Sequence, residues 1–260
     1  MTLHKSGNLG ELNHNHLTTF GRKVMKRHLK IIGLFEPIIS KIKLFILSGI
    51  IAFNYNCEDA STADNNSSNL LFIASEGNFG QNNGSISVFN KDKKIQELLN
   101  VGDVLQSILV HDDHLYAVVN GNSEIKRYAI SETGLALPGI TISTNNSSPR
   151  EMCVLNNKLY FSNWNSKDIK VLNLNTFAIE QSIPLNGLPE DIITDGTNLY
   201  ASVPHIELYD QGNGTTVVKI DPLTNQIIKT YEVGKGPQHL IIHNDNLFIS
   251  RTYYLSLIHI

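Results

Sequence analysis

The 260-residue sequence is short of the residues from which the most recognisable kinds of site are built. Its two cysteines, Cys57 and Cys153, are too few and too far apart for a disulfide framework or a zinc cluster. It lacks a Gly-Lys-Ser/Thr phosphate loop, a Gly-x-Ser-x-Gly elbow and a His-Glu-x-x-His motif. No stretch after residue 57 keeps a helical period of apolar residues. These absences disfavour the common catalytic motifs and long helices, and the sequence predicts no cofactor and no metal.

Charge is also scarce and unevenly spread, since only 17% of the residues are charged. Residues 1–56 carry 8 Lys/Arg and 2 Asp/Glu, whereas residues 57–260 carry 13 and 22. An acidic body argues against nucleic acid as a partner, because nucleic acid needs clustered positive charge. The basic head is interpreted as a targeting element.

An apolar segment at residues 44–53 follows Lys41-Ile42-Lys43. It is too short to be a stable transmembrane anchor, but it has the length of a signal-peptide core. Cys57 follows almost at once, and residues 57–69 have the polar composition of a flexible tether.

A signal core, a cysteine and a polar tether together resemble a bacterial lipoprotein. The resemblance implies that residues 41–56 are the signal peptide and that Cys57 is lipidated. Asn54-Tyr55-Asn56 departs from the aliphatic and small residues that the family prefers before the cysteine. A plain secretory signal and an uncleaved anchor stay open as alternatives. Residues 1–40 fit none of these and are interpreted as an overlong extension.

The body contains a repeat, and its most regular element is an aliphatic-aromatic pair that opens a strand. Five copies recur at intervals of 44, 44, 40 and 48 residues. They begin at Leu71, Leu115, Leu159, Leu199 and Leu247.

Other elements keep their distance from this anchor. A proline stands ten residues before it in three copies, Pro149, Pro189 and Pro237, and Leu105 takes that place in the second copy. An apolar run follows the proline, and two further alternating segments follow the anchor. Each unit is therefore predicted to be four short antiparallel strands, A to D, which is the signature of a β-propeller blade.

The repeat also predicts how much of a propeller is present. Residues 70–254 hold about 4.5 blades, or seventeen strands, because the first unit begins at strand B and the fifth has only A and B. We therefore expect an all-β propeller truncated at its C-terminus, from a ring of six to eight blades. Residues 255–260 break the repeat and are interpreted as an artefactual tail.

The units resemble the YncE-like propellers through Val233-Gly234-Lys235-Gly236-Pro237 and the Leu199-Tyr200 strand. The opening segment, residues 74–87, resembles a propeller domain of unknown function in surface lipoproteins of Bacteroidetes. The resemblance covers residues 68–254. It implies a cell-envelope location, in the outer membrane or else periplasmic or secreted, and for some members nutrient capture beside an outer-membrane transporter.

Two sets of residues are candidates for a binding site. The first is a polar pair after each proline position, where strand A enters the channel, and it is either a ligand-facing ring or merely solvated. The second lies in the loops after strand B, where Trp164 either stacks on a ligand or packs between blades. The candidates are Gln106, Arg150, Glu151, Glu190, Asp191, Gln238 and His239 in the first set, and Glu76, Asn78, Asn163 and Trp164 in the second.

Within the first set, Arg150 is expected to pair with a carboxylate or phosphate of a ligand. His111-Asp112-Asp113-His114 looks like a metal cluster but occupies the position of an A–B turn. Asp210-Gln211-Gly212-Asn213-Gly214 lacks the spacing of an EF-type calcium loop.

The sequence thus favours an exported, lipid-anchored propeller that binds a small molecule or a protein at the cell surface. A propeller enzyme of the hydrolase, lyase or quinoprotein kind is the alternative from another class, and a pure interaction scaffold is the third. The fold alone decides none of them.

Overall fold

The computed structural model describes residues 70–252, which form eighteen β-strands and no helix. The described part of the chain accordingly offers no helix that is long and apolar enough to cross a membrane. The expected extension 1–40, signal peptide 41–56, tether 57–69 with Cys57, and tail 255–260 lie outside the described residues.

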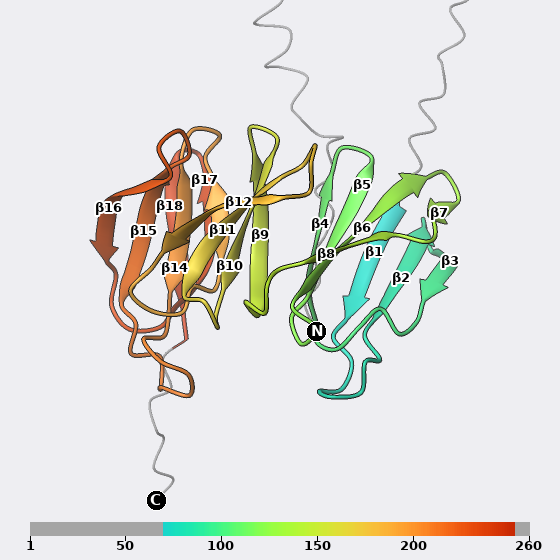
Figure 1. Cartoon of the computed structure of the whole chain (residues 1–260), viewed down its shortest axis with the longest axis horizontal. Coiled ribbons are helices and arrows are strands. Elements are labelled where there is room, and N and C mark those ends of the chain that lie inside the picture. The colour runs from blue at the N-terminus through green and yellow to red at the C-terminus, as the bar shows by residue number, and fades with distance from the viewer. Residues whose placement is uncertain (1–69, 253–260) are drawn as a thin grey trace, which may run out of the picture. The chain divides into compact units, whose positions relative to one another are not determined.

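The strands form antiparallel sheets that follow one another along the chain, as Figure 1 shows. Blade 1 is β1 (Leu70–Ser75), β2 (Ser85–Asn90) and β3 (Lys93–Leu98), and blade 2 is β4 (Leu105–His111), β5 (His114–Val119), β6 (Glu124–Ser131), β7 (Gly134–Leu135) and β8 (Ile140–Ser143). Blade 3 is β9 (Pro149–Leu155), β10 (Lys158–Asn163), β11 (Asp168–Asn173) and β12 (Ile179–Pro184). Blade 4 is β13 (Ile192–Thr194), β14 (Leu199–Val203), β15 (Thr216–Asp221) and β16 (Gln226–Glu232), and blade 5 is β17 (Pro237–His243) and β18 (Asn246–Arg251).

The all-β propeller architecture predicted from the repeat is confirmed. All five anchors lie in strand B of their blades, β1, β5, β10, β14 and β18. The one addition to the predicted strands is β7, a two-residue strand that pairs with the end of β6. It follows from a longer connection in blade 2, which no other described blade contains.

The core lies between the blades, and strand B supplies much of it. Leu159, Tyr160 and Phe161 of β10 are all fully buried. Because side chains alternate along a strand, Leu159 and Phe161 pack with Tyr116 and Val118 of blade 2, and Tyr160 packs on the side of blade 4. Both faces of strand B are therefore covered, which explains why this segment is the most regular part of the repeat.

A buried serine joins consecutive blades at the inner end of strand B. The Ser162 hydroxyl accepts a hydrogen bond from the Glu151 amide at 3.1 Å and donates one to the Glu190 carbonyl of the next blade at 2.6 Å. Ser202 makes the same two contacts, with the Asp191 amide and with the Gln238 carbonyl. Each serine thus holds the polar pair of its own blade against that of its neighbour.

We expect Ser162→Ala to lower the free energy of unfolding by about 1–3 kcal/mol, because a buried amide and a buried carbonyl lose their partner. Ser250→Ala is the matched control, since the exposed Ser250 accepts the His239 amide but lies in the last described blade. Urea denaturation of both variants measures the difference. Equal losses in the two variants would contradict the role given to the contact between blades.

Candidate functional site

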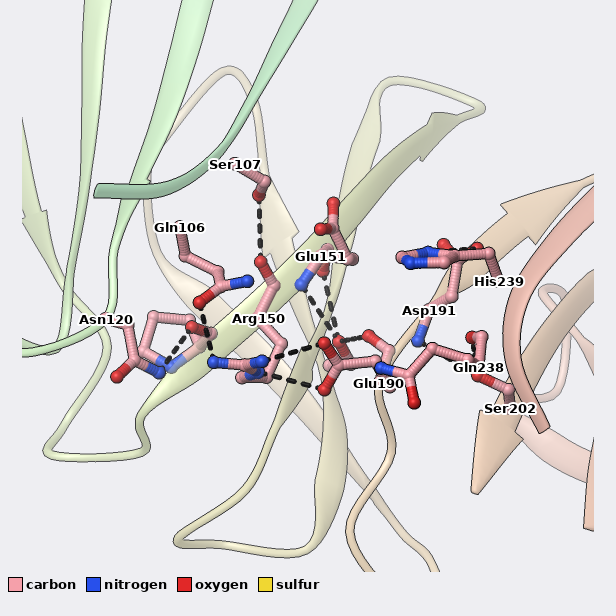
Figure 2. Close-up of polar contacts among 12 residues, drawn as sticks. Gln106, Ser107, Asn120, Arg150, Glu151, Glu190, Asp191, Ser202, Gln238 and His239 are labelled. Carbon is pink, nitrogen blue, oxygen red and sulfur yellow. Dashed lines mark hydrogen bonds and ion pairs between the residues drawn. The ribbon is translucent and has the colours of Figure 1, made fainter. Parts of the chain in front are cut away.

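The polar pairs lie on neighbouring strands, because the innermost strands β4, β9, β13 and β17 pack side by side in that order. In blade 4 the pair precedes β13 but is still fixed to β14. The Glu190 amide donates to the Ser202 carbonyl, and the Ser202 amide donates to the Asp191 carbonyl, both at 3.0 Å. The repeat therefore brings the predicted residues of blades 2 to 5 into one row, which Figure 2 shows.

Arg150 links three blades within this row. Its Nε and Nη2 donate to the two carboxylate oxygens of Glu190 at 2.9 and 2.8 Å, and its Nη1 donates to Gln106 Oε1 at 2.6 Å. The guanidinium carbon lies 4.1 Å from the centre of the Trp164 ring. Bidentate pairing and stacking are the contacts for which the planar guanidinium is best suited.

These contacts change the role expected for Arg150. Glu190 is only 3% exposed in its side chain and occupies the carboxylate position that a ligand was expected to take. Removing either partner would leave a buried charge without its counterion, which is costly. Arg150 and Glu190 therefore form an internal support for the row, while Gln106 extends that support to blade 2.

Trp164 and Asn163 do not form a free binding surface in the loop after β10. Trp164 is half-buried, with one face on Arg150, and it forms a T-shaped pair with the His205 ring at a centroid distance of 5.8 Å. Asn163 is fully buried, where it accepts the Ser147 hydroxyl and donates to the Phe161 carbonyl. Of the two interpretations of Trp164, packing between blades is the one its contacts favour.

Glu151 has the most perturbed acid–base chemistry in the row. Burial, together with the nearby Asp191 and Glu190 carboxylates, raises the pKa of Glu151 to about 8, although Arg150 acts in the opposite direction. Figure 2 shows that its carboxyl group points away from the Arg150–Glu190 pair. The Ser107 hydroxyl donates to the Arg150 carbonyl at 2.8 Å and also contacts this carboxyl group. Glu151 therefore holds its proton to higher pH than an ordinary glutamate does.

Asp191 connects blade 4 to blade 5. Its Oδ2 accepts the Leu240 amide at 2.7 Å and lies 4.0 Å from His239 Nδ1. Burial nevertheless raises the pKa of Asp191, against the effect of that amide and of His239. His239 itself is 58% exposed in its side chain, so the row ends in a residue that a ligand can reach.

Of the remaining predicted residues, Glu76 and Asn78 lie apart from the row, whereas Gln238 belongs to it. Glu76 and Asn78 are exposed in the β1–β2 loop, where Glu76 accepts the Leu105 amide through its backbone carbonyl. The Gln238 side chain accepts the Thr252 hydroxyl at 3.2 Å. Asp112 and Asp113 form the two-residue turn between β4 and β5. Within residues 70–252, no group of three His, Cys, Asp or Glu side chains is placed to hold a metal ion.

The loop between β14 and β15 is organised by Asp210. Its Oδ1 lies 2.6 Å from His205 Nδ1, and its two oxygens accept the amides of Ile206 and Gly212 at 2.7 and 2.9 Å. Desolvation would raise the pKa of Asp210, but these hydrogen bonds outweigh it and hold the pKa well below its usual range. Because both oxygens already accept N–H donors, Asp210 acts as a loop support.

Sequence reasoning missed the apolar tips of the loops after strand B. Phe79 is 87% exposed and Tyr209 is 98% exposed, and Ile206 and Leu208 beside Tyr209 are also exposed. The signal available was a large apolar residue inside a loop otherwise rich in Gly, Asn and Asp. Since the strands are antiparallel, all loops of this type leave the same face of the propeller, and the β1–β2 and β14–β15 loops project from its lower edge in Figure 1.

Comparison with known proteins supports the propeller fold but does not assign a family or a function. No protein-family profile matches the sequence, and no curated protein is significantly similar to it. Solved structures that it resembles include hydrazine synthase of Kuenenia stuttgartiensis (16% identity, TM-score 0.53, 66% of this chain and 47% of that chain) and BamB of Moraxella catarrhalis (15%, 0.51, 70% and 51%). A streptogramin B lyase structure is similar at 16% identity and a TM-score of 0.51, over 64% of this chain and 55% of the other. The chain thus spans about half the length of these propellers.

The raised pKa of Glu151 makes stability depend on pH. A carboxyl group that holds its proton more tightly when folded stabilises the fold at low pH, and this contribution is lost as pH rises. The free energy of unfolding of the unmodified protein should therefore fall relative to that of Glu151→Gln between about pH 4.5 and about pH 8. Above about pH 8 the two pH curves should run parallel. Urea denaturation across this range checks it. Parallel curves throughout would show that Glu151 titrates normally.

Proposed function

We propose that this protein is an exported, lipid-anchored propeller that binds a ligand or partner at the cell surface through the face carrying its B–C loops. The observation that carries the proposal is the pair of exposed aromatic tips, Phe79 and Tyr209, on one face. Large exposed aromatic side chains are enriched at binding interfaces, where their burial supplies much of the affinity.

The polar row supports the same face. Its residues lie at the entrances of the inner strands, at the same end of the blades as the B–C loops. Arg150 and Glu190 neutralise each other, so the surface offered there is made of hydrogen-bonding groups such as His239 and Gln106. Apolar tips around a polar centre whose Arg150–Glu190 charges are paired internally suit a partner held by contact area and hydrogen bonds more than by net charge.

The direction of β1 fits a tether that precedes it. Leu70 lies at the A–B turn end of blade 1 and Ser75 at the B–C loop end, about 17 Å away along a six-residue strand. A lipid anchor at Cys57 would therefore lead into the face opposite the apolar tips. With that arrangement the B–C face would point away from the membrane, which favours a protein partner or a captured nutrient as its occupant. An adjacent outer-membrane transporter is the partner that the family resemblance implies.

An enzyme is the second candidate, and one observation favours it. Glu151 on β9, with its raised pKa, lies near Asp191, which directly precedes β13 and is close to His239. A neutral acid beside a carboxylate is the arrangement used in general acid–base catalysis. An enzymatic function would replace binding as the proposal if the protein turned over a substrate and the Glu151→Gln variant lost that turnover.

Lipid anchoring is tested with Cys57→Ser in the full-length chain expressed in a bacterial host that processes lipoproteins. We expect the unmodified protein in the outer-membrane fraction and the variant in the soluble periplasmic fraction, because the variant lacks the acceptor thiol. Metabolic labelling with a radioactive fatty acid provides the second measurement. Membrane association that survives in the unlabelled variant would contradict a lipid anchor.

Binding through the B–C loop face is tested with the double variant Phe79→Ser, Tyr209→Ser. Leu223→Ser is the matched control, because Leu223 is 86% exposed but lies in the β15–β16 turn on the opposite face. Quantitative pull-down from solubilised membranes should recover at least about tenfold less partner with the double variant, since two aromatic anchors are lost. The control should recover as much as the unmodified protein, and an equal loss in both variants would count against this face.

A further inference from the structure

Blade 2 departs from the repeat between its third and outer strands. Its strand β6 has eight residues, whereas the equivalent β2, β11 and β15 have six each. The end of β6 pairs with β7, and the chain then returns through residues 137–139 to β8, which pairs with the first half of β6. Among the described blades, only this one carries such an extra hairpin.

The extra hairpin is fixed against blade 1. The Gln96 side chain, from β3, donates to the Leu135 carbonyl at 2.9 Å and accepts the Leu135 amide at 2.7 Å. Gly139 lies on the Tyr128 ring so closely that a Cβ atom there would come within 2.5 Å of the ring. The returning segment is therefore held in place at both ends.

A hollow of about 550 Å³ lies beneath this segment. It is lined by Lys126, Tyr128, Leu137, Pro138, Gly139 and Thr141. Lys126 and Tyr128 share one face of β6, and Thr141 is the register partner of Lys126. The volume is within the range of small-molecule sites, and the walls exist without a ligand.

The lining combines apolar surface with hydrogen-bond donors and contains no carboxylate. Leu137 is 61% exposed and extends the apolar wall formed by Pro138. Lys126 donates to the Val101 carbonyl, which uses one of its three hydrogens, and it has no ion-pair partner within residues 70–252. In the same range the hydroxyls of Tyr128 and Thr141 make no hydrogen bond to the protein.

We propose that this hollow binds a small carboxylate with an apolar body. The carboxylate would accept hydrogen bonds from Lys126 and from the Tyr128 or Thr141 hydroxyl, and the apolar body would cover Leu137 and Pro138. A cationic ligand would meet an ammonium group without a compensating acid. The site is lined by blade 2 alone, contains no residue of the polar row, and is independent of the function proposed above.

The test uses phenylacetate as the probe and the isotope-labelled full-length chain. In an NMR titration, phenylacetate should shift the Gly139 and Thr141 amides saturably, and uncharged phenylacetamide should bind at least about tenfold more weakly, because it lacks the charge-assisted hydrogen bond. Lys126→Met should weaken phenylacetate binding by about tenfold for the same reason. Lys229→Met is the matched control, because Lys229 and Tyr231 have the same spacing on an outer strand of blade 4 and lie close together there.

Three results would overturn the proposal. One is the absence of saturable shifts up to about 10 mM phenylacetate, beyond which binding has little specificity. Another is equal affinity for the acid and the amide. The third is an unchanged affinity in Lys126→Met, or an equal loss in Lys229→Met, with the amide spectra confirming that both variants are folded.

Discussion

Every other feature of this propeller depends on the packing of one blade against the next. A strand such as β10 buries both of its faces, one toward each neighbour, so a single blade has no core of its own. The buried serines and the Arg150–Glu190 pair add hydrogen bonds across the same contacts. In such repeat architectures stability is approximately a sum of contributions from neighbouring pairs. The polar row exists because those pairs are stacked in sequence order.

The fold followed from the sequence because its signals are local and repeated. The aliphatic-aromatic anchor and the alternating segments after it recur in each unit, and the proline ten residues before the anchor recurs in three of them. A segment that is ambiguous in one blade can therefore be assigned from the others. The structure differs at β7, where blade 2 contains residues with no counterpart in the repeat. A periodic pattern cannot predict what departs from it, and the hollow near Lys126 was therefore not foreseen.

The sequence predicted that the polar pairs would lie in one row, but not which contacts they would make there. Periodicity alone brings Gln106, Arg150 and Glu190 to neighbouring strands, although 40 or more residues separate each from the next. It does not say that Arg150 and Glu190 face each other instead of a ligand, because that depends on side-chain direction. The raised pKa of Glu151 likewise depends on burial among other acids, which appears only after the blades are packed. Phe79 and Tyr209 stand out in sequence as large apolar residues within polar loops, but nothing local shows whether such a side chain turns inward or outward.

The hydroxyl that joins consecutive blades has one further consequence, seen where the repeat fails. Blade 2 has Val118 in the position of Ser162 and Ser202, and the contact with blade 3 comes instead from Ser107 on strand A, which donates to the Arg150 carbonyl. The proton donor has changed residue and strand, while the acceptor has kept its place. This kind of divergence between blades is therefore better traced by which carbonyl accepts the hydrogen bond than by which amino acid occupies an aligned position. An alignment of the blades by residue identity would mark Val118 as a loss where the hydrogen bond has been preserved.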